Sequence, residues 1–359
     1  DCDDGLVCLD GLCSFCLLAA SDDPRDLSPR CSPCGEASIQ LPIAAPNVVF
    51  VVDKSASMVS HEFDHDGDPE TAATTRWHAL HAALFELLST YDGSLGAGLS
   101  LFPSLAAKSY YDASACPVAD AVEVPVAPMN GATVFSVLPS EWATSAEIAG
   151  ASPTRLGLVN AVDHLSAQDD GLAAAIVLIT DGAANCSPDA ETEQERFEVY
   201  DAALVDVVAD AAALGITTYV VGLDVADVTS PIEQDGEPDD LNNHAALSEL
   251  AVAGGGATDD PDEPFYNAGD GPALAASLAS IRDRLLPCDV ALEPPPAFPE
   301  IVEIDVDGVV YTHPVRDCAT EDGWRFTDDS FDHIELCGLA CADFRAAGFA
   351  TAAYRCALD

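Results

Sequence analysis

The sequence predicts an α/β fold with a doubly wound, mostly parallel sheet over residues 41–288 and a small module on either side. The first observation is four apolar runs of strand length, at 48–52, 97–102, 174–180 and 217–223. They lack strict alternation, which is typical of strands buried on both faces of a parallel sheet. The second observation is stretches of helical apolar spacing between and after these runs, at 75–91, 154–166, 196–215, 244–255 and 272–288. Strands that alternate with helices favour a sheet covered on both faces.

The flanking segments differ from this domain in composition. Residues 1–40 are rich in Cys, Asp, Pro and Ser and poor in hydrophobic periodicity, so we expect a small disulfide-rich module there. Residues 289–359 begin with a Pro-rich joint and continue with strand-like runs separated by Asp-Gly turn signals. They predict a small disulfide-bonded β module, with a short helix or turn and one strand in its last part.

Thirteen cysteines indicate an oxidising, extracellular compartment, and hence a secreted or cell-surface protein. A four-thiolate zinc site is the alternative in the first module, because residues 13–16 and 31–34 both read C-x-x-C. The odd total leaves one thiol whose partner lies upstream or in another chain. The chain begins without Met or a signal-peptide pattern, so we expect a mature or trimmed product.

The chain is strongly acidic, with 62 Asp and Glu against 13 Lys and Arg and a formal net charge of −49. Nucleic acid is excluded as a partner, because such binding requires cations that neutralise phosphates. The longest apolar run, 41–52, is too short for a membrane span, so the chain is expected to be soluble. The acidity serves either solubility or affinity for divalent cations, which prefer oxygen ligands.

Hard oxygen donors follow the first predicted strand in the stretch "NVVFVVDKSASM". Asp53 ends that strand, and Ser55 and Ser57 follow at alternate positions. Because ligands gather at the carboxyl ends of the strands in a doubly wound sheet, these oxygens are candidates for half of an octahedral Mg²⁺ shell. Asp181 ends another strand, and Thr154 opens a helix, at similar rims. A helix cap is the alternative role for the two serines.

Three segments, "VVFVVDKSASM", "SPTRLGLVNAV" and "IVLITDG", resemble in order and spacing those of the von Willebrand factor A domain family. The resemblance covers residues 41–288 and implies a metal-ion-dependent adhesion site. Asp53, Ser55, Ser57 and Thr154 would be direct or near-direct ligands, and Asp181 would hold the metal through water. The family's usual Gly between the serines is Ala56 here, which is tolerated if the loop needs no positive φ. The chain is also similar in architecture to bacterial surface proteins of several modules.

The resemblance implies Mg²⁺, or Ca²⁺ or Mn²⁺ in its place, with an open coordination position that accepts an Asp or Glu carboxylate of a protein ligand. The leading hypothesis is therefore an extracellular adhesion protein with no enzymatic activity. The second hypothesis is a subunit of an extracellular homo-oligomeric or filamentous assembly, in which copies of the chain bind each other. We expect Cys116 to pair with Cys186 and fix the rim of the site; separate pairings with the flanking modules are the alternative.

Two further motifs suggest other chemistry. The segment "HEFDH" matches H-E-x-x-H and suggests a zinc hydrolase using His61, Glu62 and His65, but the following Gly67 and Pro69 argue against the helix that such a site requires. The acidic stretch 64–70 lacks the Gly and the bidentate Glu of an EF-hand. A second acidic stretch, 231–240, is expected to be a solvated loop on the rim.

Overall fold

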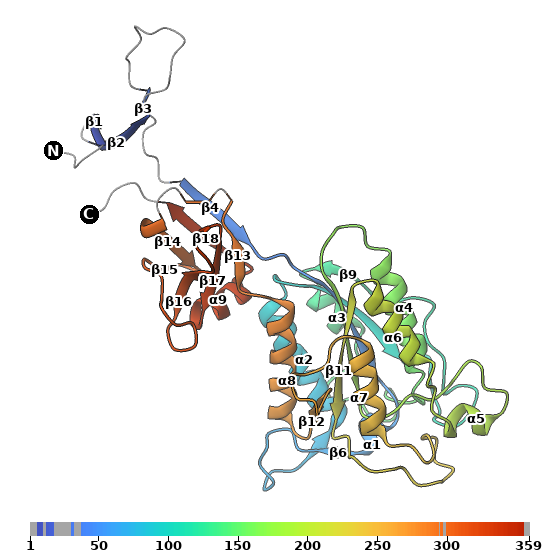
Figure 1. Cartoon of the computed structure of the whole chain (residues 1–359). Coiled ribbons are helices and arrows are strands. Elements are labelled where there is room, and N and C mark those ends of the chain that lie inside the picture. Colours follow the sequence, from blue (N-terminus) through green and yellow to red (C-terminus); the bar gives the residue numbers. More distant parts are fainter. Residues whose placement is uncertain are drawn as a thin grey trace. The chain divides into compact units, whose positions relative to one another are not determined.

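The computed structural model describes residues 37–293, 295–296 and 299–354, and three short strands before them whose side chains are not described (Figure 1). Those strands are β1 (Leu6–Leu9), β2 (Leu12–Leu17) and β3 (Arg30–Cys31), joined in one antiparallel sheet. The chain forms two compact units, one of residues 44–286 and one of residues 1–43 and 287–359.

The larger unit contains a six-stranded sheet in the order β12-β11-β10-β5-β8-β9. Its strands are β5 (Asn47–Asp53), β8 (Gly96–Phe102), β9 (Val124–Pro128), β10 (Ala174–Thr180), β11 (Ile216–Leu223) and β12 (Tyr266–Ala268). All neighbours are parallel except β9, which pairs antiparallel with β8 at one edge. Counted along the chain, the order is 3-2-1-4-5-6, that of a doubly wound fold. The predicted mixed α/β architecture with a mostly parallel sheet is confirmed.

Helices cover both faces of this sheet (Figure 1). Val48, Phe50 and Val52 of β5 pack with α2 (Arg76–Tyr91), α3 (Gly131–Val137) and α8 (Gly271–Leu285). Val49 and Val51, which point the opposite way, pack with α4 (Thr154–Ser166), α6 (Leu204–Ala213) and α7 (Asn243–Ala253). The uninterrupted apolar sequence of β5 therefore reflects its burial on both sides. Within the described residues, no helix has both the length and the apolar character needed to cross a bilayer.

One predicted helix, 196–215, is interrupted in the structure. Residues form α5 (Glu193–Glu198), then an extended turn, then α6. The break begins at Val199, a β-branched residue with φ −119° and ψ 131°. It allows the buried Asp201 carboxylate to lie 2.8 Å from Nε of Arg155, while the Asp201 amide donates to the Ala184 carbonyl. A tertiary ion pair has therefore overridden the helical periodicity.

In the smaller unit, residues 37–43 and 287–354, so far as they are described, form two antiparallel sheets, ordered β13-β17-β16 and β15-β14-β18-β4, around a core that includes Trp324 and Phe344. Its elements are β13 (Asp289–Ala291), η1 (Pro299–Ile301), β14 (Val302–Val306), β15 (Val309–Tyr311), β16 (Gly323–Phe326), β17 (His333–Cys337), α9 (Leu339–Ala347) and β18 (Phe349–Tyr354). The Asp307-Gly308 turn has positive φ at both residues, as a type I′ hairpin requires. Disulfides join Cys288 to Cys341 and Cys318 to Cys337, so the expected internal disulfides are present.

The strand β4 (Ala37–Pro42) crosses the boundary predicted between residues 40 and 41. It pairs antiparallel with β18, and Leu41 is buried in the core of the smaller unit. Its backbone hydrogen bonds thus place β4 in the C-terminal sheet, and not in the predicted 1–40 module or the predicted 41–288 domain. The cysteine side chains of the predicted 1–40 module, and with them the zinc alternative, lie outside the described residues.

Arg155 forms one exposed and one buried ion pair, so two variants can compare what each pair contributes to the stability of the larger unit. Asp201 is 4% exposed, whereas the side chain of Asp189, 2.8 Å from the same guanidinium, is 80% exposed. We expect Asp201→Ala to lower the free energy of unfolding by about 3 kcal/mol, because it removes the buried partner of Arg155 and leaves only the exposed Asp189. Asp189→Ala should cost less than about 1 kcal/mol. Urea unfolding of both variants measures the difference, and equal costs would contradict a larger contribution of the buried ion pair.

Candidate metal centre

The candidate site lies where the strand order of the large sheet reverses, between β5 and β10. Chain connections leave these two neighbouring strands in opposite directions, which opens a crevice at their carboxyl ends. Asp53 is the last residue of β5, and Asp181 directly follows β10. Two residues predicted from separate motifs are therefore brought to one edge of the sheet by topology alone.

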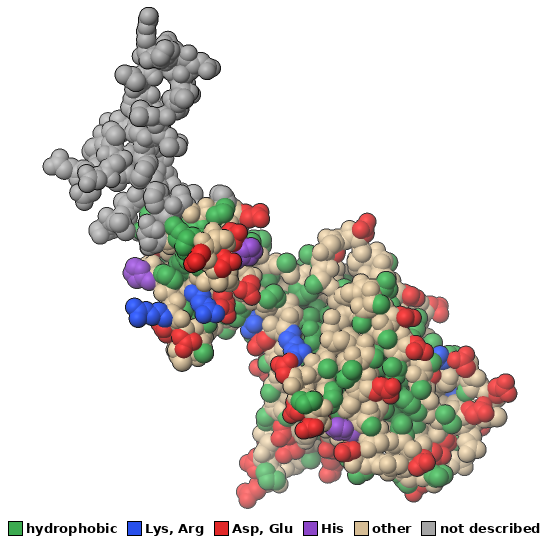
Figure 2. Space-filling model, in the orientation of Figure 1, with side chains coloured by type: hydrophobic (Ala, Val, Ile, Leu, Met, Phe, Trp, Pro, Cys, Tyr) green, Lys and Arg blue, Asp and Glu red, His purple; other side chains and the backbone are tan. Residues whose placement is uncertain are grey.

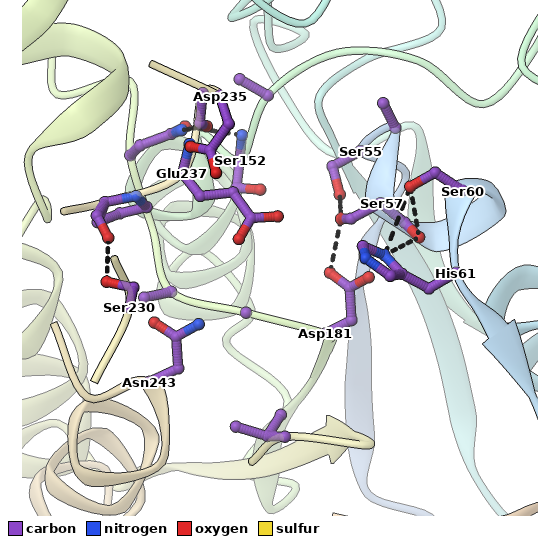
Figure 3. Close-up of a pocket in the computed structure, with 18 of the residues that line it drawn as sticks. Ser55, Ser57, Ser60, His61, Ser152, Asp181, Ser230, Asp235, Glu237 and Asn243 are labelled. Carbon is purple, nitrogen blue, oxygen red and sulfur yellow. Dashed lines mark hydrogen bonds between the residues drawn. The ribbon is translucent and has the colours of Figure 1, made fainter. Parts of the chain in front are cut away.

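Four of the five predicted ligands form one hydrogen-bonded network, of which Figure 3 shows Ser55, Ser57 and Asp181. The Asp53 carboxylate accepts from the Ser55 amide at 2.7 Å and from the Thr180 hydroxyl at 2.6 Å. The hydroxyls of Ser55 and Ser57 are 2.9 Å apart, and Ser57 donates to Oδ1 of Asp181 at 2.8 Å. The side chains that the sequence places 124 residues apart thus meet through direct contacts.

Thr154 lies outside this network. It is buried at the start of α4, and its hydroxyl donates to the Ser152 carbonyl at 3.3 Å. The segment that precedes α4 is nevertheless tied to the Asp53 loop. Ala56 donates its amide to the Gly150 carbonyl at 3.0 Å, and the buried Lys54 ammonium donates to the carbonyls of Glu147 and Ala149.

The local backbone favours a ligand role for the serines over a capping role. Ala56 is the residue before the short helix α1 (Ser57–Ser60) and has φ −62°, so the loop needs no glycine there. No side chain caps this helix. The hydroxyls of Ser55 and Ser57 are therefore directed to each other and to Asp181 instead of to the helix amides.

The electrostatics of Asp53 favour a neighbouring cation. Burial, and then the charge of Asp181, raise the pKa of Asp53 to about 7, although hydrogen bonds from Ser55 and Thr180 oppose the rise. Burial also lowers the pKa of Lys54 to about 8. A cation close to two carboxylates would offset their repulsion and their loss of hydration. The donor set of carboxylates and hydroxyls suits Mg²⁺, Ca²⁺ or Mn²⁺.

A metal at this rim would need oxygen ligands besides carboxylates. In the part of the chain that the structure describes, no three His, Cys, Asp or Glu side chains are arranged to hold a metal ion. A site built here consequently depends on Ser55 and Ser57 as well as on the carboxylates.

Sequence reasoning missed Arg76, the first residue of α2. Its guanidinium lies 2.9 Å from Oδ2 of Asp181 and 3.3 Å from Oδ2 of Asp224, which follows β11. No motif marks this arginine. The available signal was the rarity of basic residues in an acidic chain, since a buried arginine must be paired.

A cavity of about 510 Å³ opens over the network. Ser55, Ser57 and Asp181 line one side, and Figure 3 shows Asp235 and Glu237 on the opposite side. These two acidic residues belong to the 231–240 loop, which the sequence placed at the rim as a solvated loop. The loop is thus a wall of the cavity as well as a solvated segment.

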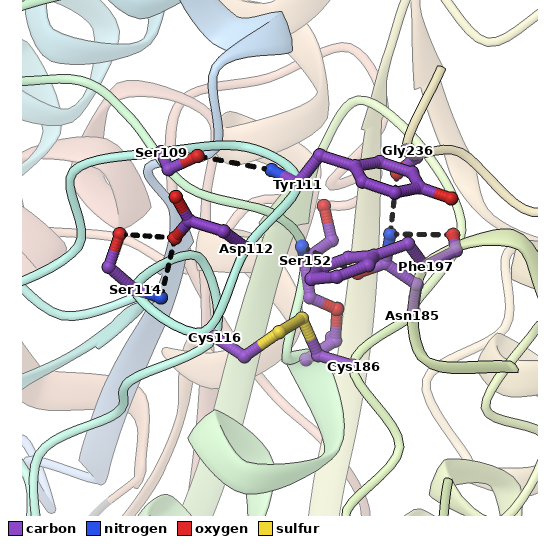
Figure 4. Close-up of a disulfide and its surroundings, with 11 residues drawn as sticks. Ser109, Tyr111, Asp112, Ser114, Cys116, Ser152, Asn185, Cys186, Phe197 and Gly236 are labelled. Atoms are coloured by element: carbon purple, nitrogen blue, oxygen red, sulfur yellow. Dashed lines mark hydrogen bonds between the residues drawn. A yellow bond between two sulfur atoms is a disulfide. The ribbon is translucent and has the colours of Figure 1, made fainter. Parts of the chain in front are cut away.

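The predicted disulfide between Cys116 and Cys186 is confirmed (Figure 4). Next to it, the buried Asn185 side chain, which the sequence did not reveal, donates to the carbonyls of Phe197 and Gly236 at 3.1 and 2.6 Å. The same side chain accepts from the Ser152 amide at 2.8 Å. The disulfide and this amide together connect four loops around the cavity and hold its rim.

The zinc-hydrolase alternative lacks its helix. α1 ends at Ser60, and Glu62 lies in β6 (Glu62–Phe63), which pairs with β7 (Thr74–Thr75). His61 and His65 therefore do not share one face of a helix, as H-E-x-x-H requires. The acidic stretch 64–70 instead forms local turns in which Asp carboxylates accept amides within the same loop.

Comparison of the sequence with protein-family models gives no match, and comparison with curated proteins gives none either. Many solved structures show partial likeness, of which three are described. The conserved hypothetical protein BatB from Bacteroides thetaiotaomicron has 17% identity and a TM-score of 0.39, covering 66% of this chain and 98% of that chain. The pilus adhesin SpaC from Lactobacillus rhamnosus GG has 14% identity and a TM-score of 0.48, covering 89% and 41%. The PilB minor pilin from Streptococcus sanguinis has 17% identity and a TM-score of 0.42, covering 69% and 62%. Likenesses at these values assign no function to this chain.

We expect loss of the rim disulfide to destabilise the larger unit substantially. The bond closes a loop with a sequence separation of 70, so replacing both Cys116 and Cys186 by Ser should cost about 4 kcal/mol of unfolding free energy. Replacing Cys318 and Cys337, separated by 19, should cost about 3 kcal/mol in the smaller unit. Calorimetry measures both costs, and limited proteolysis should show new cleavage in the rim loops only for the first pair. If cleavage of the rim loops is unchanged, the Cys116–Cys186 disulfide does not hold the rim of the cavity.

Proposed function

We propose that the larger unit binds one divalent cation, Mg²⁺ in the first instance, and through it captures an Asp or Glu carboxylate of a protein ligand. The observation that supports this most directly is the network of Asp53, Ser55, Ser57 and Asp181 at the sheet's switch point. The resemblance to von Willebrand factor A domains gives the same ligand set, with Thr154 added. We propose binding and not catalysis as the role of the chain.

The bound cation would supply a concentrated positive charge to which a carboxylate oxygen can bind. Asp53 is a fully buried carboxylate that accepts hydrogen bonds from the Ser55 amide and the Thr180 hydroxyl, which fix its position. Ser55 and Ser57 contribute neutral oxygens, which satisfy a cation without cancelling its charge. Asp181 is held by Ser57, and, as the resemblance implies, it would contact the cation through a hydrogen bond from an intervening water.

The cavity is large enough to admit an acidic side chain of a partner. A volume of about 510 Å³ lies in the range of small-ligand sites, and the rim loops are anchored by the disulfide and Asn185. A rigid rim lowers the entropic cost of binding. The partner would accordingly insert one acidic side chain with little rearrangement of this unit.

The acidity of the protein opposes this partner at long range. Figure 2 shows acidic side chains spread over the visible face, and the formal net charge is −49. Screening limits that repulsion to about 8 Å at physiological salt, so it slows association more than it weakens contact at the cation. Capture should consequently become faster as salt is added.

The disulfides support an extracellular setting, since three are formed among the described residues and such bonds persist in oxidising compartments. The captured carboxylate can belong to another protein or to a second copy of this chain. Light scattering with Mg²⁺ and with EDTA separates these cases: assembly that requires Mg²⁺ indicates self-association, and a monomer under both conditions indicates a different partner.

Calorimetric titration with Mg²⁺ tests the proposal. The wild-type chain should bind one ion in the larger unit, and both Asp53→Asn and Ser57→Ala should weaken binding by about 100-fold or more, beyond the usual effect of indirect ligands. Asp206→Asn, an exposed change on α6, is the matched control and should bind as the wild type does. A wild-type chain that shows no Mg²⁺ binding, or variants that bind like the control, would refute the proposal.

A further inference from the structure

Arg76 places a fixed positive charge in the wall of the candidate site. It is 8% exposed, and Nη1 contacts Asp181 at 2.9 Å while Nη2 contacts Asp224 at 3.3 Å. The other Asp181 oxygen accepts a hydrogen bond from Ser57, so the Asp181 carboxylate bridges Arg76 and Ser57. Among the described residues that line the cavity, it is the only Lys or Arg.

The position of Arg76 is unfavourable for a helix taken alone. It is the first residue of α2, whose first turn contains no acidic residue. A cation at a helix N-terminus meets the positive end of the helix dipole. The carboxylates of Asp181 and Asp224, which follow β10 and β11, compensate for this unfavourable interaction with the helix dipole. The Arg76 charge is therefore stabilised by residues of the site and not by its own helix.

We propose that Arg76 is the built-in counter-cation of the site, weakening cation binding while strengthening capture of the ligand carboxylate. This inference rests on the proposed function. When ionised, Asp53, Asp181 and Asp224 bring three negative charges together, and Arg76 offsets one of them. Arg76 thereby lowers the negative charge that remains around a bound divalent cation, which favours the approach of a carboxylate. Without Arg76 the loaded cluster would be more negative and would repel that carboxylate more strongly.

The inference predicts effects of opposite sign, which a purely structural role would not produce. Removing the guanidinium charge strengthens the attraction between a divalent cation and Asp181, and weakens the attraction between the loaded site and an anion. Loss of a merely structural arginine would instead disorder Asp181 and Asp224 and weaken both binding steps.

The experiment measures the two steps separately on the full chain. Mg²⁺ binding is followed by calorimetry without ligand, and carboxylate binding by the Mn²⁺-induced broadening of acetate signals in nuclear magnetic resonance. Arg76→Gln should bind Mg²⁺ about tenfold more tightly and acetate about tenfold more weakly than the wild type. Arg76→Lys, which restores the charge, should return both values toward those of the wild type. Arg282→Gln is the control, because that guanidinium contacts Asp283 and Tyr91 on α8 and α2 and does not line the cavity.

Each outcome has a distinct meaning. Opposite shifts in Arg76→Gln, absent in Arg282→Gln, support the counter-cation. Shifts in the same direction, or none, overturn it while leaving the cation site of the proposed function intact. If the wild type binds neither Mg²⁺ nor Mn²⁺, the proposed function fails and the counter-cation fails with it. Thermal unfolding of Arg76→Gln confirms that the variant is folded before either titration is interpreted.

Discussion

The placement of one carboxylate at the end of the central strand determines the architecture of the candidate site. Asp53 has no exposed surface, and burial of a charge without partners is strongly unfavourable. Thr180 of the neighbouring strand and the Ser55 amide of the following loop supply its hydrogen bonds. The parallel register of β5 and β10 therefore determines both where the sheet's crevice opens and which oxygens meet there.

The parts of the fold that follow from local periodicity could be predicted from the sequence. The four apolar runs became β5, β8, β10 and β11, because strands buried on both faces need apolar side chains throughout. The short edge strands β9 and β12 could not be predicted, since their few residues carry no clear period. The break at Val199 was also hidden, because it depends on a partner, Arg155, that is distant in the sequence.

For the site, motifs identified the residues that begin or end elements, and topology then brought them together. Asp53, Ser55, Ser57 and Asp181 were predicted in this way, and the structure joins them by hydrogen bonds. Thr154 was predicted by the same resemblance, yet its hydroxyl is directed to its own preceding turn. Arg76 and Asn185 had no motif, because their roles arise only from contacts between loops.

The pairing of β4 with β18 has a mechanical consequence. Because β4 precedes the larger unit in the chain and β18 follows it, the larger unit is an insertion within the smaller unit. Ala37 is opposite Tyr354 at one end of this antiparallel ladder, so the chain enters and leaves at the same end. Tension applied through the flanking segments would unzip that ladder one hydrogen-bonded pair at a time. The inserted unit, and any partner bound to it, would bear no load until the ladder had opened.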